Sequence, residues 1–225
     1  MVAQEVLVRD EIARDVRYFR VKRILDVVLT ILALIPVSVI MLITAILIRI
    51  DSPGPVIFKQ TRFGLNGAKF TFYKFRSMYH NAPSTPHEEA IVTWMNGTDA
   101  INHDSSDKPY KLGDDARITR VGSFIRKTSI DELPQLWNVL RGDMSIVGPR
   151  PPLEYELKRY SVHHFRRLAG KPGLTGTWQV YGRGRVTFEE MVEQDITYLE
   201  TQSVRYDLKL MIMTVPVMIT GRGGA

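Results

Sequence analysis

Two adjacent carboxylates, Asp131 and Glu132, lie in a segment rich in cations, with Arg126 before them and Arg150 after them. Neighbouring acids repel each other, so proteins normally separate them unless a metal ion or nearby cations hold both. Acids that bind a metal and cations that bind phosphates are also the groups that phosphoryl transfer requires. The segment therefore indicates a site for phosphorylated substrates.

The same acids could instead mark the start of a helix. Ser129 and Glu132 match the capping-box pattern S-x-x-E, and apolar residues repeat at helical spacing over 133–140. Pro134 complicates this interpretation, because it would fall just past the first turn, where a backbone N–H is needed. A helix that begins one or two residues later removes the difficulty and leaves Asp131 near its start, where free amides can meet a phosphate. The residues alone leave both interpretations open.

Two further segments carry candidate substrate-binding residues. Arg150 lies between two prolines, which fix the backbone and favour a guanidinium that presents two N–H groups to a phosphate. The segment KPGLTGTWQVYGR, residues 171–183, places Trp178 and Tyr181 among three glycines. These rings could flank a nucleotide or a sugar, although a tight turn before a strand is the simpler interpretation.

Composition excludes several classes of protein. The sequence has neither a G-x-x-x-x-G-K-[ST] loop nor a G-x-G-x-x-G motif after a strand, so an ATPase or dinucleotide-binding enzyme is not expected. It contains no cysteine, which excludes disulfides and thiolate metal sites. The 225 residues carry a net charge of +6, with a pI of about 9.5. This charge favours anionic partners such as phosphorylated substrates or anionic lipid.

An uncharged run over residues 27–48 is long enough to cross the roughly 30 Å hydrocarbon layer as a helix. Pro36 near its middle predicts a kink. Basic residues mark the cytoplasmic flank of a span, and here they lie on both sides of the run. A helix that breaks at Pro36, enters the membrane and returns would satisfy both flanks. The residues alone leave this re-entrant arrangement and a single span equally open.

The rest of the chain predicts an α+β fold that is mainly helical. We expect an amphipathic N-terminal segment over residues 1–22, a membrane helix over 23–50 and a cytosolic, membrane-associated domain over 51–225. Two aromatic-rich stretches around Asn66-Gly67 predict a small β-hairpin.

Local signals also place further helices in this domain. The capping box of Thr187 and Glu190 begins one of them. Others are expected over 133–140 and 153–168, and a short one near 88–94 within a polar loop over 79–111. The apolar stretch over 208–220 is expected to pack on the domain or to lie at the membrane interface.

These motifs together resemble those of the bacterial sugar transferases, the monotopic polyprenyl-phosphate phosphoglycosyl transferases. The resemblance covers nearly the whole chain from Lys22 onward. The segments that carry it are KRILD (22–26), DSPGPVIFKQTRFG (51–64), KFRSM (74–78), RITRVGSFIRKTSIDELPQLWNVLRGDMSIVGPRP (117–151), KPGLTGTWQVYGR (171–183) and YDLKL (206–210).

The resemblance implies that Asp131 is a nucleophile that attacks the β-phosphate of a UDP-sugar, releases UMP and forms a sugar-phosphoryl aspartate. A polyprenyl phosphate, expected to be undecaprenyl phosphate, then accepts the sugar phosphate. Glu132 is implied as the partner acid, and both acids as ligands of Mg²⁺. Four cations are implied to bind phosphate: Arg126, Arg150, Lys74 and Arg76. Three residues are implied to bind the nucleotide or the sugar: Trp178, Gln179 and Arg183.

The resemblance also implies a place for the chemistry. Both ends of a re-entrant helix would be cytoplasmic, with the site on the cytosolic face of the bacterial inner membrane. The implied partners are UDP-sugar, undecaprenyl phosphate and membrane lipid, without nucleic acid. The oligomeric state stays open, with a homodimer as one option. The reaction would be the first membrane step in the assembly of an exopolysaccharide, O-antigen or glycoconjugate.

Two departures from the family pattern are visible. The loop over 79–111 is longer than in the smallest members, and Gln202 stands where Trp is often found. The chain is expected to correspond to the catalytic unit alone, and its sugar is not identified, although longer members often transfer glucose or galactose phosphate. The alternative function is a non-enzymatic, membrane-anchored basic module that regulates glycan assembly. It explains the charge and the apolar run but gives no reason for the acid pair.

Overall fold

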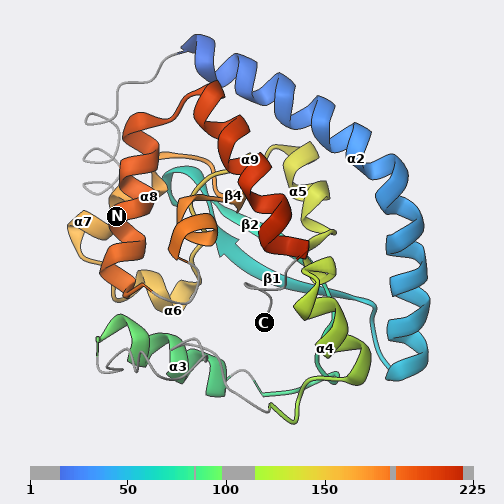
Figure 1. The fold of residues 1–225 in the computed structure, drawn as a ribbon. Helices are drawn as coiled ribbons and strands as arrows, with labels where there is room; N and C mark the ends of the chain where they lie inside the picture. The colour runs from blue at the N-terminus through green and yellow to red at the C-terminus, as the bar shows by residue number, and fades with distance from the viewer. Residues whose placement is uncertain (1–15, 84, 98–114, 183–185, 220–225) are drawn as a thin grey trace.

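The computed structural model describes residues 16–83, 85–97, 115–182 and 186–219. Helices surround two small sheets, and the long helix α2 (Val16–Asp51) curves along one side of the molecule (Figure 1). The prediction of a mainly helical fold with a small antiparallel sheet is confirmed. Residues 1–15, 98–114 and Arg183 lie outside the described residues, so the predictions that fall on them are not addressed by the structure.

The apolar run forms part of α2, which extends further toward the N-terminus than the sequence suggested. The boundary expected at residue 22 falls inside the helix. The helix also continues through Pro36 as one curved element rather than as two helices (Figure 1). Ser38 Oγ donates a hydrogen bond at 2.8 Å to the carbonyl oxygen of Ile35, the residue before the proline.

Most of the apolar surface of α2 is exposed. Among the described residues, α2 is the one helix long and apolar enough to cross a membrane, judged by length and composition alone. Large apolar side chains point away from the domain along its length, including Ile24, Val28, Ile31, Leu32, Ile35, Val39, Ile40, Leu42, Ile43, Ile46, Leu47 and Ile50. A helix so exposed is not the core helix of a soluble fold.

Both ends of α2 are attached to the same domain. Tyr18, Lys22, Asp26 and Thr30 are buried at four-residue spacing, which places them on one stripe of the first half. In the second half, Ile48 packs with Phe75 and Ile125, next to Met41 and Ala45. Among the described residues between Thr30 and Thr44, none is buried. The middle of α2 is therefore its least buried part.

The predicted hairpin is confirmed. Strands β1 (Ile57–Phe63) and β2 (Lys69–Phe75) pair antiparallel, with Ile57 opposite Phe75. Their connection is longer than a two-residue turn and contains the 3-10 turn η1 (Leu65–Gly67). Asn66 and Gly67 both adopt positive φ, 55° and 74°, which these residue types tolerate better than others.

A second sheet was not predicted. Strands β3 (Ser145–Val147) and β4 (Gly173–Thr175) form a parallel pair of three residues each, too short to give a periodic signal. The chains approach closely here, since a Cβ on Gly148 would lie 2.3 Å from the carbonyl oxygen of Lys171. The loop that carries Arg150 begins at this contact.

Shorter helices complete the fold. Three expected helices are confirmed: α3 (Thr85–Met95), α5 (Gln135–Arg141) and α8 (Phe188–Thr201). Helix α4 (Arg120–Lys127) was not predicted. The single helix expected over 153–168 is wrong, because the chain forms α6 (Glu154–Leu157), α7 (Val162–Phe165) and the 3-10 turn η3 (Arg166–Ala169). Ser161 and His164 form a capping box that begins a new helix in the middle of this stretch.

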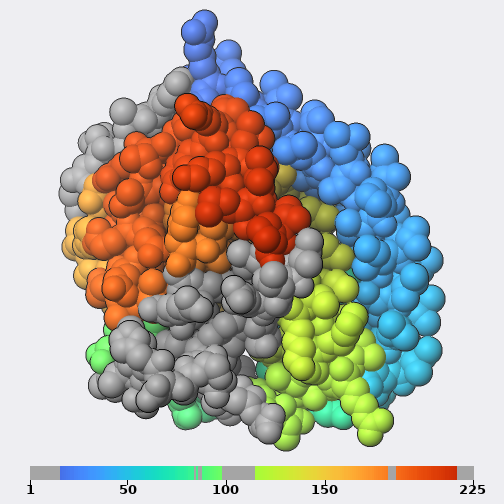
Figure 2. Space-filling model, in the orientation of Figure 1, coloured from blue at the N-terminus to red at the C-terminus, as the bar shows by residue number. Residues whose placement is uncertain are grey.

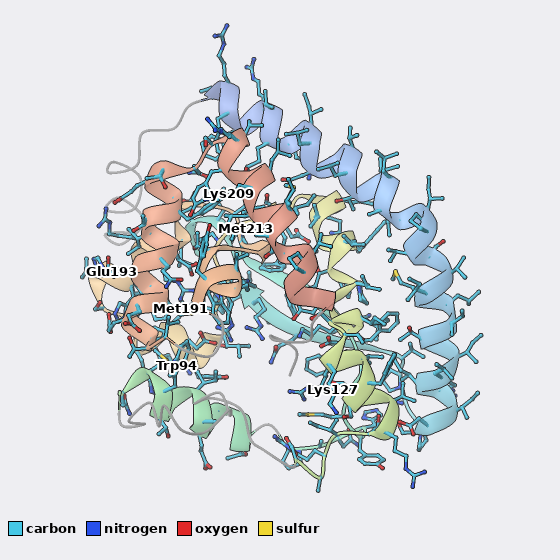
Figure 3. The ribbon with its side chains drawn as sticks, in the orientation of Figure 1. Trp94, Lys127, Met191, Glu193, Lys209 and Met213 are labelled. Atoms are coloured by element: carbon cyan, nitrogen blue, oxygen red, sulfur yellow. The ribbon has the colours of Figure 1, made fainter. Side chains whose placement is uncertain are left out.

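Helix α8 forms the core of the C-terminal half and holds α3 in place. Thr187 and Glu190 make the predicted capping box at its start. Trp94 of α3 lies in one buried cluster with Met191 and Phe188 of α8, and Figure 3 shows Trp94 facing that helix. The part of the 79–111 loop that the structure describes is thus anchored to the domain through α3.

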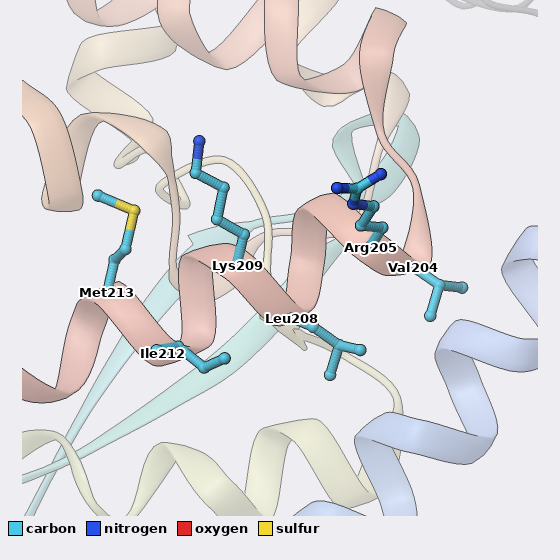
Figure 4. A pocket seen from close by; sticks show the side chains of 6 residues that line it. All are labelled: Val204, Arg205, Leu208, Lys209, Ile212 and Met213. Carbon is cyan, nitrogen blue, oxygen red and sulfur yellow. The ribbon is translucent and has the colours of Figure 1, made fainter.

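Helix α9 (Val204–Ile219) packs on the domain and also exposes apolar side chains. Leu210 is fully buried, whereas Ile212 is 71% exposed. Val204, Leu208 and Ile212 lie on one side of α9, while Arg205 and Lys209 lie on another (Figure 4). These residues and Met213 line an open hollow of about 650 Å³. On the face seen in Figure 2, α9 lies next to the first half of α2.

Candidate active site

The acid pair, Asp131 and Glu132, lies in the 3-10 turn η2 (Ile130–Glu132) immediately before α5. Ser129 has a left-handed backbone, with φ 57°, and its side chain makes no capping hydrogen bond. Helix α5 begins at Gln135, after Pro134. The capping-box interpretation is therefore wrong, and the later helix start is confirmed. The acids are not explained as helix punctuation.

Lys74 brings positive charge to both acids from a distant part of the chain. Its Nζ lies 3.2 Å from Asp131 Oδ2 and 3.3 Å from Glu132 Oε1. Strand β2, which carries Lys74, contacts η2 directly. The side chain of Asp131 is 9% exposed and that of Glu132 is 33% exposed. One ammonium group thus neutralises part of the charge of two carboxylates, and the more buried acid is Asp131.

Asp131 and Lys74 each change the pKa of the other. Burial raises the pKa of Asp131, and the charge of Glu132 raises it further, while Lys74 and Arg126 oppose the shift. For Lys74, burial disfavours the charged form, but the attraction of both acids outweighs it and the pKa is raised. Lys74 therefore stays protonated, and its charge helps Asp131 to ionise.

The two predicted arginines differ in their surroundings. Burial lowers the pKa of Arg126, at the end of α4, although Asp131 counteracts this. Arg150 makes a two-pronged ion pair with Glu156, with Nη1 at 2.9 Å from Oε2 and Nη2 at 3.2 Å from Oε1. Glu156 is fully buried, and the sequence did not single it out.

Two of the predicted substrate residues, Arg76 and Trp178, make structural contacts within the domain. Arg76 donates to the carbonyl oxygens of Pro53 and Ser52 at 2.7 Å, so both terminal nitrogens hold the turn after α2. Trp178, in the π-helical turn η4 (Trp178–Gly182), is buried in the core cluster with Trp94. Neither contact tests the predicted substrate roles, and both roles stay predictions. Gln179 of the same turn has a buried Oε1 without a hydrogen-bond partner among the described residues, and its predicted role stays a prediction.

The sequence reasoning missed Arg62. It lies on β1, is 9% exposed and donates from Nη1 to the carbonyl oxygen of Pro151 at 2.8 Å. Burial and the charge of Arg150 lower its pKa to about 10, although Glu156 and Glu132 oppose the shift. Its guanidinium also lies over the ring of Phe72, 5.1 Å from the centroid. The signal was present, because Arg62 falls within one of the motifs that carried the resemblance.

The residues present suit a magnesium ion. Among the described residues, no group of three or more His, Asp or Glu side chains gathers, so an ion at the acid pair would need further ligands from substrate or water. Mg²⁺ prefers oxygen ligands and is often bound by one or two carboxylates together with substrate phosphates. Two carboxylates on successive residues, one of them partly exposed, meet that requirement.

Comparison with protein families matches residues 17–221 to the family described as bacterial sugar transferase. The chain belongs to this family. This chain shares 43% identity over 203 residues with the galactosyl transferase CpsE of Streptococcus agalactiae. It shares 41% over 202 residues with the undecaprenyl-phosphate galactose phosphotransferase of Salmonella typhimurium. With the UDP-glucose:undecaprenyl-phosphate glucose-1-phosphate transferase of Caulobacter vibrioides it shares 40% over 207 residues.

These relatives are longer than this chain. The matches cover 90%, 90% and 88% of this chain, in the same order. They cover 43%, 41% and 70% of the relatives. The chain thus spans about two fifths of the length of the first two.

Proposed function

We propose that this protein transfers a sugar 1-phosphate from a UDP-sugar to undecaprenyl phosphate. The observation that carries the proposal is Lys74 between the two carboxylates of the acid pair, which makes a buried, partly neutralised nucleophile site. The names of the Salmonella and Caulobacter relatives support the acceptor, and that of the Caulobacter relative supports a UDP-sugar as donor. The sugar itself is left open between glucose, galactose and others.

The reaction proceeds in two displacements at phosphorus. The ionised carboxylate of Asp131 forms a bond to the β-phosphorus of the donor, and the bond from that phosphorus to the bridging oxygen breaks, so that UMP leaves with the electron pair. A phosphate oxygen of the acceptor then forms a bond to the same phosphorus, and the aspartate carboxylate leaves unchanged. The product is an undecaprenyl diphosphate sugar.

The other residues support these displacements. Lys74 favours the ionised form of Asp131. Glu132 is the partner acid, placed to orient or to deprotonate the acceptor phosphate. Asp131 and Glu132 would hold Mg²⁺, which when bound neutralises charge on the diphosphate. Arg126 and Arg150 add positive charge around the phosphates.

The attachment of α2 supports a re-entrant arrangement. Asp26 accepts a hydrogen bond from the Ile146 amide near one end, and Asp51 accepts one from the Val121 amide at the other. A straight span would place these ends on opposite sides of a layer roughly 30 Å thick. One domain cannot reach both sides without entering the lipid. We therefore place both ends on the cytosolic face of the bacterial inner membrane, where soluble UDP-sugars and the acceptor phosphate meet.

Exposed apolar side chains on three neighbours of α2 support the same orientation. Phe124 of α4, Trp137 of α5 and Ile212 of α9 are each more than half exposed, and each of these helices contacts α2. Tryptophan is enriched where a protein meets the membrane interface. The alternative of a non-enzymatic basic module accounts for this surface but not for an acid pair that shares one lysine.

The reaction is tested with purified protein, Mg²⁺, undecaprenyl phosphate and a panel of UDP-sugars, with UMP release as the readout. We expect release with at least one sugar and none from Asp131→Asn. The matched control is Glu154→Gln, which removes an exposed acid of α6 and should release UMP at the wild-type rate. Normal release by Asp131→Asn would contradict the nucleophile assignment. Absence of release with every sugar would favour the basic module.

The membrane arrangement has its own test, because the chain contains no cysteine. Single cysteines at the exposed positions Arg20 and Lys59 lie on opposite sides of the apolar run. In intact cells, an impermeant thiol reagent should label neither, and in lysed cells it should label both. Labelling of one position alone in intact cells would show that α2 spans the membrane.

A further inference from the structure

A second charged cluster lies beside the acid pair, built around Arg62 and Arg150. Glu156 is the carboxylate partner of Arg150, and Arg62 makes no ion pair within the described residues. Two arginines and one acid leave this cluster with one net positive charge. The acid pair with Lys74 carries one net negative charge. The site therefore consists of two adjacent groups of opposite sign.

Arg62 is a buried cation held by neutral groups. Its Nε donates to Gln60 Oε1 at 3.1 Å, and its Nη1 donates to the Pro151 carbonyl. Its Nη2 has no hydrogen-bond partner among the described residues. A buried guanidinium without a counter-ion costs free energy, and such groups are characteristic of functional sites.

The hydroxyl of Tyr155 belongs to the same cluster as Arg62 and Arg150. Its oxygen is buried and has no hydrogen-bond partner within the described part of the chain. Tyr155 and Glu156 are neighbours on α6, and α6 contacts β1, the strand that carries Arg62. Burial and the charge of Glu156 raise the pKa of Tyr155 to about 12, although Arg150 and Arg62 oppose the shift. A buried donor that lacks an acceptor, in the same cluster as a guanidinium whose Nη2 makes no hydrogen bond within the described residues, is complementary to an oxyanion.

We propose that Arg62 and Arg150, with the hydroxyl of Tyr155, bind a phosphate group of a substrate beside the acid pair. Glu156 is a positioning residue that holds the guanidinium of Arg150 in this orientation. The inference rests on the proposed function and deepens it, since the phosphate belongs to one of the two substrates. Lys74 is already shared by two carboxylates, so the negative charge of a diphosphate needs these further cations.

The source of the phosphate is either the nucleotide or the lipid acceptor, and two measurements distinguish them. The first is the affinity for UDP and for uridine, measured by calorimetry on the purified full chain. The second is the KM for undecaprenyl phosphate. We expect Arg62→Gln to weaken one of these phosphate affinities by roughly tenfold to a hundredfold, as for a charge-assisted hydrogen bond, and to leave uridine binding unchanged. Weaker UDP binding assigns the phosphate to the nucleotide, and a higher KM assigns it to the acceptor.

Further variants separate binding from folding. Tyr155→Phe keeps the ring and should weaken the same affinity, and Arg62→Lys should restore part of the loss. Glu156→Gln should raise the KM of the same substrate with little change in kcat. The matched control is Lys59→Gln, which removes an exposed charge from the same strand and should change neither affinity. If Arg62→Gln does not fold, Tyr155→Phe decides the question.

The proposal is overturned if folded Arg62→Gln, or Tyr155→Phe in its place, keeps wild-type affinity for UDP and wild-type KM for undecaprenyl phosphate. That result would leave the proposed function intact if the wild type turns over. Conversely, the wild type could turn over no UDP-sugar and still bind UDP in a way that depends on Arg62. That result would contradict the proposed function and support the phosphate site.

Discussion

A buried network of hydrogen bonds ties the membrane helix to the domain through a single acceptor, Asp207 of α9. Its Oδ2 accepts from Lys22 at 2.7 Å and from Tyr18 at 2.9 Å, and its Oδ1 accepts from Tyr198 at 2.6 Å. The side chains of Lys22 and Asp207 are 9% and 3% exposed. Replacement of Asp207 therefore leaves three buried donors without their shared charged acceptor.

The expected effect of Asp207→Asn follows from this burial. Removal of one partner of a buried ion pair costs about 3–5 kcal/mol, since the other charge stays buried. In a protein of this size, each kcal/mol lowers Tm by about 2–4 °C. We therefore expect Asp207→Asn to unfold about 6–20 °C below the wild type.

The measurement is thermal unfolding of both proteins in the same detergent, followed by circular dichroism. The control is Glu200→Gln, which breaks the surface ion pair with Arg166. The side chain of Glu200 is 46% exposed and that of Arg166 is 27% exposed. Exposed pairs contribute about 0–1 kcal/mol, so the control should unfold close to the wild type. If Asp207→Asn unfolds at the temperature of the control, the network does not hold α2 and the reasoning is refuted.

Two further predictions concern the site. Because Lys74 lowers the pKa of Asp131, Lys74→Gln should raise that pKa further, and the acid limb of the pH–rate profile for UMP release should move to higher pH. An unmoved limb would mean that Asp131 does not titrate in that range. Gly148→Ala places a Cβ 2.3 Å from the Lys171 carbonyl oxygen, so strands β3 and β4 must separate. Its Tm should fall and UMP release should slow, and a variant with wild-type values of both would show that the contact does not position Arg150.

Local signals predicted much of the fold. The hairpin followed from Asn66-Gly67 between aromatic strands, and α8 followed from its capping box, because each is decided by neighbouring residues. The helix over 153–168 failed because Ser161 bonds the backbone ahead of it and begins a second helix, which apolar spacing does not reveal. The strands β3 and β4 depend on contacts between distant segments and were missed.

The site was predictable only where its residues are neighbours in the sequence. The acid pair was visible as two neighbours, but Lys74 reaches it across 57 positions of the chain, and spacing alone does not show that contact. Arg76 looked equivalent to Lys74 from two residues away, yet it holds the turn after α2. Arg76 lies just past the end of β2, so the alternation of side chains along the strand does not fix its direction, and only the contacts distinguish the two cations.

The central claim is that Asp131 becomes covalently phosphorylated by the donor before the acceptor takes part. The most direct measurement is UMP release from purified protein, Mg²⁺ and the preferred UDP-sugar without undecaprenyl phosphate. A covalent intermediate predicts a burst of about one UMP per protein that then stops, together with its absence in Asp131→Asn. UMP that appears only after undecaprenyl phosphate is added would mean direct transfer and would contradict the claim.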